Sequence, residues 1–497
     1  MKIQKHKVAL IVIFAITLLT RLLFAFQTNN FSDGDSYFAI RQIEHISLHR
    51  IPLINDTLSY GGRIHLLTPL FYYLLSFFTL FMPSYIVGKL IPNILMSLLV
   101  FIIYLITKEL TGDIKVSLFT SLVSSFTPIL FTTTFNSISP YSLVIPTIFF
   151  GLYFLLKLPK KHSYASYFLL TTFLLAITHP SSFVFILGLI FYLALLVAER
   201  LEIRKSELEV ILFSTFLVVW LQFILFKKAF LVHGPAVIWQ NIPEAMHSQF
   251  FTQFTIIDAI SQIGIVPLIF GIYMVYRCTF IEKNRQLYLV VGFVASTTLL
   301  LWLKLIPINV GLMILGLALV ILFGKFMQIF IQYVKRTRFS NFKLIFVACF
   351  VMLFVATSVI PTLYYGNATV NNSFSDEEIA ALIWIRKNTP KNATVVALPE
   401  EGHLITSVAQ RKNVMDTDFL LMQDAEIRLA DIIDIFTTVS ETEAIELLNK
   451  YSASYIYFSP RAKSKLGIKS LRFVEPKCFP VVYNRTVEIY KSVCELR

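Results

Sequence analysis

The chain has 497 residues, of which 56% are hydrophobic and only 15% are charged, and its mean hydropathy is +0.71. A soluble domain carries about a quarter charged residues, so this composition predicts a protein that crosses a membrane many times. The net charge of +13 is scattered over short loops, as in basic cytoplasmic loops. Since the sequence has no basic stripe with stacking aromatics, we expect membrane lipid and no nucleic acid as a partner.

Apolar segments along the chain predict the membrane-spanning helices. The first runs from Val8 to Phe26 after the basic start MKIQKHK, and it lacks a small-residue cleavage site, so we expect an uncleaved helix. Several others are short for a hydrocarbon core of about 30 Å, so we expect about 11–13 transmembrane helices in all. The predicted spans are 8–26, 84–107, 115–133, 141–156, 165–178, 182–198, 208–226, 257–276, 287–303, 308–333 and 343–361.

The charge of the loops predicts how the chain is oriented across the membrane. If the N-terminus is cytoplasmic, each cytoplasmic loop carries Lys or Arg, and the external loops are poorer in them, as the positive-inside rule expects. An odd number of spans then places the C-terminal part outside, and we expect an integral protein of the plasma membrane. The cytoplasmic loops in this reading are 108–115, 157–162, 199–207, 277–285 and 334–343.

The composition changes after residue 365. Ser375 and Glu378 are typical of a capping box, and the helix that follows should stop at Pro390. A second capped helix should begin at 440–443, and residues 393–398, 454–459 and 487–492 are typical of strands. We therefore expect a transmembrane domain over 1–365 and a small external α/β domain over 366–497. Cys478 and Cys494 lie in the second domain, where their spacing allows a disulfide without requiring one.

Two external loops, 27–83 and 227–256, are unusually long. In the first, the apolar stretch 65–81 would break the loop-charge pattern if it spanned, so we expect an interfacial or partly buried helix there. The same loop begins with FSDGDSYFAIRQIEHI (31–46), which puts Asp33 and Asp35 just outside the membrane. These acids either cap the helix that begins near Ser36, or act as a catalytic base or metal ligand at the bilayer surface.

Several segments resemble, in order and spacing, the catalytic subunit of oligosaccharyltransferase and, more broadly, the GT-C superfamily of membrane glycosyltransferases. In the first external loop and second helix these are DSYFAIR (35–41), LSYGGRIHLLTPLFYYLL (58–75) and GKLIPNILMSLLVFIIYLITKEL (88–110). Further along they are WQNIPEAMHSQ (239–249), LKLIP (303–307) and the stretch 384–419. The resemblance implies a polytopic α-helical fold of GT-C type and an enzyme that uses a polyprenyl-phosphate-linked sugar.

The resemblance also implies roles for individual residues. Asp35 matches the essential acid of the first external loop, and we expect it to be the base for the acceptor hydroxyl, with Asp33 as the alternative. Glu244 matches a glutamate that lies near the donor or acceptor. Lys304 stands where the family has a cation against the lipid-linked phosphate, with Lys in place of the usual Arg, although a lysine at a helix mouth could also snorkel.

Several other polar residues in the external segments have two possible roles, one functional and one structural. Arg41 either holds the donor phosphate or pairs with Asp35 or Glu44 on the helix face. Arg63 follows Gly61 and Gly62 in a turn and could contact sugar or phosphate. His179 is either a phosphate or acceptor contact or a satisfied turn histidine. We expect His403 to be a surface residue of the C-terminal domain.

Two departures from the family pattern limit what can be carried over. At the position of the WWDYG motif, which reads the acceptor sequon in the family, this chain has LPEEG (398–402). The second acidic motif is replaced by Asn136, Ser137 and Ser139. Since a divalent cation prefers several charged oxygen ligands, we assign no metal ligand, and Mg²⁺ or Mn²⁺ would find only a weakened site.

Together these features predict transfer of a sugar from a polyprenyl-phosphate-linked donor to a glycan, lipid or protein acceptor at the outer face of the membrane. Two alternatives remain open. One is a divergent oligosaccharyltransferase that moves a whole lipid-linked glycan to protein, and the other is a non-catalytic assembly or receptor subunit. A transporter is disfavoured because acids within the predicted spans are scarce.

Overall fold

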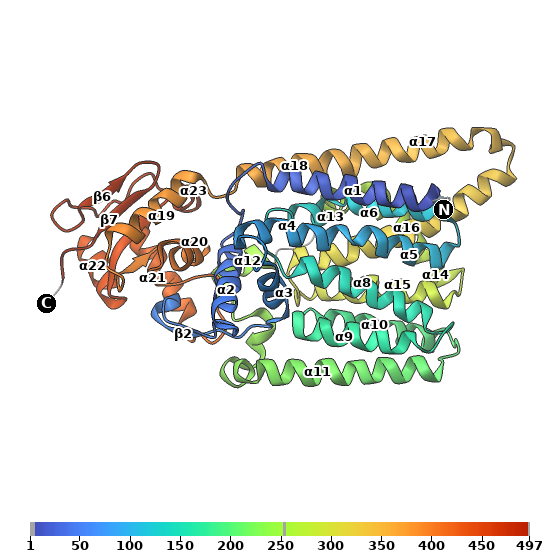
Figure 1. The fold of residues 1–497 in the computed structure, drawn as a ribbon, viewed down its shortest axis with the longest axis horizontal. Coiled ribbons are helices and arrows are strands. Elements are labelled where there is room, and N and C mark those ends of the chain that lie inside the picture. Colours follow the sequence, from blue (N-terminus) through green and yellow to red (C-terminus); the bar gives the residue numbers. More distant parts are fainter. Residues whose placement is uncertain (1–4, 252–254, 496–497) are drawn as a thin grey trace.

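The structure is a computed structural model that describes residues 5–251 and 255–495. A bundle of long helices forms most of it, and a mixed sheet with short helices lies at one end of the bundle (Figure 1). Within the described residues, six helical segments are long and apolar enough to cross a membrane, and five shorter apolar helices accompany them. These segments fall on the predicted spans, so the predicted polytopic helical fold is confirmed.

The bundle is built around α16, whose residues Val310–Gly324 are all buried. Its neighbours α14, α15 and α6 pack against it. By contrast α1, α11 and α17 carry exposed apolar side chains such as Val12, Phe216 and Met352, which suits contact with lipid. The bundle helices are α1 (Lys5–Ala25), α4 (Ser84–Ser97), α5 (Leu99–Thr111), α6 (Ile114–Ser125), α7 (Pro128–Thr132), α8 (Tyr141–Lys157), α9 (Tyr164–Thr178), α10 (Ser182–Ala198), α11 (Lys205–His233), α13 (Ile256–Ile263), α14 (Ile265–Phe280), α15 (Arg285–Trp302), α16 (Ile308–Arg336), α17 (Lys343–Phe354) and α18 (Ile360–Asn371).

The first long loop has its own secondary structure. It contains α2 (Asp35–His49), the short strands β1 (Asn55–Asp56) and β2 (Arg63–Ile64), and α3 (Leu70–Phe78). The nine residues of α3 reach only about 14 Å, far less than a bilayer core. This length agrees with the expectation that the apolar stretch does not span. In the second long loop, η2 (Gly234–Trp239) and α12 (Glu244–Phe250) follow α11.

The C-terminal part contains a five-stranded sheet of order β4-β3-β5-β7-β6. The pairs β3–β4 and β3–β5 are parallel, and β5–β7 and β6–β7 are antiparallel. The predicted capping box forms, with both hydrogen bonds present between Ser375 and Glu378. The elements are α19 (Asp376–Asn388), β3 (Thr394–Val396), α20 (Pro399–Leu404), β4 (Lys412–Asn413), α21 (Ala425–Thr437), α22 (Glu441–Lys450), β5 (Ala453–Phe458), α23 (Pro460–Leu466), β6 (Val481–Asn484) and β7 (Glu488–Lys491).

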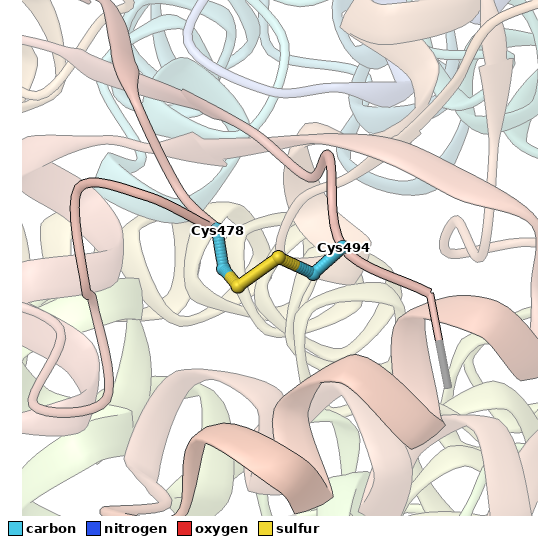
Figure 2. Close-up of a disulfide and its surroundings, with 2 residues drawn as sticks. All are labelled: Cys478 and Cys494. Atoms are coloured by element: carbon cyan, nitrogen blue, oxygen red, sulfur yellow. A yellow bond between two sulfur atoms is a disulfide. The ribbon is translucent and has the colours of Figure 1, made fainter. Parts of the chain in front are cut away.

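A disulfide joins Cys478 to Cys494, with the two Cα atoms 5.0 Å apart (Figure 2). The strands β6 and β7 lie between these cysteines in the sequence, so the bond ties together the two ends of this strand pair. The change from long helices to the sheet falls between Asn371 and Asp376. The predicted domain ranges 1–365 and 366–497 stay a prediction.

The first loop and the C-terminal part share one hydrophobic core. Phe31 and Ile43, from the loop, pack in the same cluster as Leu382, Val395 and Leu404. Since burial of apolar surface is the main source of stability, this shared core holds α2 against the sheet region. It therefore fixes where the N-terminus of α2 lies relative to α20 and β4.

Candidate functional site

The N-terminus of α2 approaches α20 without an intervening side chain. Gly34 precedes the helix, and a Cβ atom on it would lie 2.3 Å from the backbone oxygen of Glu400. Any other residue would push the two segments apart, so this glycine permits the close approach. As a result Asp35, the first residue of α2, faces residues of the C-terminal part.

Asp35 has an open carboxylate with a defined set of neighbours. Its side chain is 73% exposed, and Nε2 of His403 lies 3.8 Å from its Oδ1. The hydroxyl of Thr417 donates a hydrogen bond of 2.6 Å to the same oxygen. The carboxylate is thus held from one side and remains accessible to solvent on the other.

Asp33 is engaged in capping α2. Its Oδ1 accepts hydrogen bonds from the amide of Ser36 at 2.7 Å and from the hydroxyl of Ser36 at 2.8 Å. Burial and the charge of Asp35 raise the pKa of Asp33, while hydrogen bonds from Ser137 and Ser36 act in the opposite direction. Asp33 fits the capping role, and Asp35 is the carboxylate free to meet a substrate.

Aromatic rings line the space beside Asp35. The ring of Phe38 lies 5.0 Å from His65, 5.1 Å from His403 and 6.2 Å from Tyr72, measured between ring centroids. Burial raises the pKa of Tyr72, and the charges of Asp35 and Asp418 add to this effect. Flat apolar walls next to a carboxylate are suited to a sugar ring or an acyl chain.

A chain of charged pairs lies behind this wall. Arg41 makes two hydrogen bonds to Asp56, of 2.6 and 2.7 Å. His65 lies between two carboxylates, 3.3 Å from Oδ2 of Asp56 and 2.8 Å from Oδ2 of Asp418. Despite burial, hydrogen bonds from His65 and Arg41 hold the pKa of Asp56 well below its usual range. Of these pairs, His65 with Asp418 joins the first loop to the C-terminal part.

Arg63 belongs to the same structural network. Its guanidinium is buried and lies 3.6 Å from Asp416 and 3.3 Å from Asp418. It also donates a hydrogen bond of 2.6 Å to the carbonyl of Leu420. Both arginines therefore have protein partners, and Arg41 pairs with Asp56 instead of Asp35 or Glu44. A contact of Arg41 or Arg63 with the donor stays a prediction.

Glu244 and Lys304 lie on two neighbouring loops. The indole of Trp239 donates a hydrogen bond of 2.9 Å to the carbonyl of Lys304. The side chain of Lys304 is exposed. Glu244 begins α12 with an exposed side chain, and its amide donates to Glu426 at 2.9 Å. The exposed ammonium of Lys304 is free to approach a phosphate at the membrane surface, which keeps its predicted role open.

His179 joins α9 to α10. Its ring lies 4.8 Å from the ring of Tyr141, and its Nδ1 is 2.9 Å from the hydroxyl of Ser181. Burial lowers the pKa of His179 to about 4, so the imidazole is neutral at physiological pH. A neutral imidazole is a weaker partner for a phosphate than a cation is, which favours the reading of a satisfied turn histidine.

Sequence reasoning missed the contribution of the C-terminal part. The expectation that His403 is a surface residue is wrong, because its side chain is only 2% exposed and packs against Phe38. Thr417, whose hydroxyl holds Asp35, lies in the segment Asp416-Thr417-Asp418, shortly after β4. The sequence signal that could have identified this segment is the pair of acids around a threonine, just after a stretch typical of a strand.

Among the described residues, no group of three or more His, Cys, Asp or Glu side chains is placed to hold a metal ion. In the segment that replaces the family's second acidic motif, the neutral residue Ser137 contacts Asp33, and the carbonyl of Asn136 accepts from Ser32. Since a divalent cation prefers charged oxygens, we derive no reaction step through one.

Comparisons with known proteins show a similarity to one family over part of the chain. Residues 67–226 match the family described as dolichyl-phosphate-mannose-protein mannosyltransferase. A comparison with curated protein sequences finds no match.

Solved structures with the same fold include three glycosyltransferases. The archaeal oligosaccharyltransferase AglB from Archaeoglobus fulgidus, in complex with an inhibitory peptide and a dolichol-phosphate, has a TM-score of 0.73 and 15% identity, over 93% of this chain and 70% of that chain. ArnT from Cupriavidus metallidurans bound to undecaprenyl phosphate has a TM-score of 0.60 and 10% identity, over 97% and 98% of the two chains. The arabinofuranosyltransferase AftD from Mycobacteria has a TM-score of 0.60 and 12% identity, over 98% of this chain and 40% of that chain.

The fold is that of the GT-C membrane glycosyltransferases. The fold that the sequence resemblance implied is therefore confirmed, and the structural similarity extends over nearly the whole chain.

Proposed function

We propose that this protein transfers a sugar from a polyprenyl-phosphate-linked donor to an acceptor hydroxyl of a glycan, lipid or protein. The observation that carries this proposal is the open carboxylate of Asp35, held by Thr417 where the bundle of a GT-C fold meets its external segments. A carboxylate in this position can accept the proton of an attacking hydroxyl.

The reaction forms one bond and breaks another at the anomeric carbon of the sugar. The acceptor oxygen bonds to this carbon and its proton passes to Asp35, while the bond to the phosphate oxygen breaks and the electron pair leaves with the phosphate. The leaving phosphate needs a cation. The exposed ammonium of Lys304 is the candidate, because Arg41 and Arg63 are paired with carboxylates of the protein.

The class of donor rests on the comparisons. The description of the matching family names dolichyl-phosphate-mannose. Two of the similar structures contain dolichol-phosphate or undecaprenyl phosphate. A donor with a polyprenyl tail stays in the bilayer, so its phosphate is presented at the membrane surface. The external end of the bundle, where α2 and α3 lie, is the matching place for such a donor.

A divergent oligosaccharyltransferase is the alternative that the similarity to AglB favours. The residues at the sequon-reading position weaken this alternative. Pro399, Glu401 and Gly402 are buried within α20, and Glu400 pairs with Lys465. A buried segment offers little surface to an acceptor peptide, so transfer of a single sugar is the preferred reading.

The test is a transfer assay on the full chain in lipid nanodiscs with a panel of labelled polyprenyl-phosphate and polyprenyl-diphosphate sugars. We expect Asp35→Asn to lower transfer at least about 100-fold, since general-base catalysis contributes roughly 100- to 10,000-fold. Asp33→Asn should have a smaller effect because Asp33 caps α2. The matched control is Asp434→Asn, which removes an exposed acid on α21. Transfer that survives Asp35→Asn unchanged would overturn the assignment of Asp35.

A further inference from the structure

We infer that Thr417 and His403 are positioning residues for Asp35, so that the C-terminal part completes the catalytic site. This inference rests on the proposed function, because it assigns a role in the same reaction. Thr417 and His403 lie in the stretch 384–419, more than 360 residues after Asp35 in the chain. Their contacts with Asp35 therefore arise from the tertiary fold and not from closeness in the sequence.

The hydroxyl of Thr417 fixes one oxygen of the Asp35 carboxylate. Its hydrogen bond to Oδ1 is 2.6 Å long, in the range expected when a hydroxyl donates to a charged carboxylate. The side chain of Asp35 is otherwise largely exposed and would sample several rotamers. With Oδ1 held, Oδ2 is presented in one direction, and orientation of a reacting group accelerates the chemical step.

Thr417 is itself held firmly, because both of its neighbours in the chain are anchored. Asp416 accepts hydrogen bonds from Ser59 at 2.6 Å and from Asn413 at 3.1 Å. Asp418 is 2.8 Å from His65 through its Oδ2. A functional side chain is placed accurately when its supporting residues are fixed by their own partners, and this segment meets that condition.

His403 supports the carboxylate from the side of the sheet. Its Nε2 lies 3.8 Å from Oδ1 of Asp35 and its Nδ1 lies 3.7 Å from Oδ2 of Asp416. Both distances exceed a hydrogen bond, so His403 acts by occupying the space behind Asp35. It is held there by Phe38 and by the close packing of Gly402, whose added Cβ would lie 2.1 Å from the carbonyl of Met415.

The sharpest test replaces the hydroxyl of Thr417 while keeping its shape. Thr417→Val removes the donor with little change in volume, and Thr417→Ser restores it. We expect Thr417→Val to lower kcat about 10- to 100-fold, with KM for the lipid donor and the melting temperature unchanged. Thr417→Ser should recover most of the rate. Equal rates for Thr417→Val and wild type, or equal losses in both variants, would overturn the inference.

His403 is tested by a graded pair of substitutions. His403→Gln keeps a polar side chain of similar length, whereas His403→Ala empties the space behind Asp35. We expect the alanine variant to lose more of kcat than the glutamine variant, again without a matching change in KM. An alanine variant with wild-type kcat would contradict the role of His403.

A second experiment separates this inference from the proposed function. If the wild-type protein transfers no sugar from any donor, the proposed function fails, but the placement of Thr417 can still be measured. Asp35→Cys with Thr417→Cys, in a Cys349→Ser background, should be joined by a short thiol cross-linker.

The control pairs Asp35→Cys with Asn484→Cys on β6, at the far edge of the sheet from β4. Cross-linking of the first pair alone supports the placement. Cross-linking of both pairs, or of neither, would overturn it.

Discussion

Aspartates gather where the first loop meets the C-terminal part, and each has different partners. Asp33 accepts from Ser36, and Asp56 pairs with Arg41 and His65. Asp416 lies against Ser59 and Arg63. Asp35 differs because its carboxylate is mostly in solvent. At the scale of single residues, the acids with buried cationic or hydroxyl partners are thus distinguished from Asp35, the acid proposed to react.

Glu401 shows how one residue can make stability depend on pH. It is 1% exposed, and burial, together with the charge of Glu378, raises its pKa to about 8 from a usual value of 4.5. The folded protein therefore holds a proton that the unfolded chain releases between these two pH values. Stability contributed by this protonated group is fully present below about pH 4.5 and falls as the pH rises towards 8.

Glu401→Gln should remove this loss of stability, because the amide has the same shape and does not ionise. We expect the variant and the wild type to have similar melting temperatures below about pH 4.5, and the variant to be more stable by roughly 1–3 kcal/mol at pH 9. Thermal unfolding across this range is the measurement. The control is Glu400→Gln, which alters the partly exposed neighbour that pairs with Lys465. Parallel pH profiles for Glu401→Gln and wild type would contradict the argument.

At the scale of elements, local patterns in the sequence were sufficient to predict the helices and their caps. Hydropathy located the spans, and the residue types of Ser375 and Glu378 predicted a capping box that forms. The partners of charged side chains could not be predicted in this way. His65 reaches Asp418 across 353 residues, and Arg41 reaches Asp56 across 15 residues. Such contacts depend on how the first loop docks on the sheet, which no local pattern encodes.

The candidate site could likewise be predicted from the sequence only in part. The position of Asp33 and Asp35 at a helix start beside the membrane could be read from residues 31–46. Their different roles could not, because they depend on Ser137, Thr417 and His403 from other parts of the chain.

The docking of the β1–β2 hairpin should depend on pH through His65. Burial alone would lower its pKa, but hydrogen bonds to Asp418 and Asp56 raise it above the usual value of 6.5. A group with a raised folded pKa contributes its full stability below 6.5, and this contribution is lost as the pH rises through the folded pKa. We therefore expect the hairpin to open more readily at alkaline pH.

Hydrogen exchange of the amides in residues 54–66 measures this opening. After correction for the intrinsic effect of pH, exchange in the wild type should rise on the order of tenfold between neutral and alkaline pH. In His65→Gln, exchange should be faster at neutral pH and nearly independent of pH. An unchanged pH dependence in His65→Gln would show that other groups control the docking.

At the scale of the whole molecule, the two ends of the bundle differ in chemistry. The N-terminus lies at the end opposite to the sheet (Figure 1). Basic residues of the predicted cytoplasmic loops make ion pairs, such as Lys157 with Glu109 at 2.5 Å and Lys283 with Glu199 at 2.7 Å. The C-terminal part carries the disulfide Cys478–Cys494, and disulfides persist in oxidising compartments. The disulfide favours the predicted orientation, in which the sheet lies on the external side of the membrane.

Labelling of single cysteines with a membrane-impermeant maleimide tests this orientation. In a Cys349→Ser background, Glu446→Cys on α22 should react in intact cells, because its exposed site lies in the C-terminal part. Lys161→Cys, exposed between α8 and α9, should react only after the membrane is permeabilised. The reverse pattern would contradict the orientation, and labelling of neither site in intact cells would place the protein in an internal membrane. Because Asp35 contacts the C-terminal part through Thr417, the side on which Glu446→Cys reacts is also the side on which the proposed function places the sugar donor.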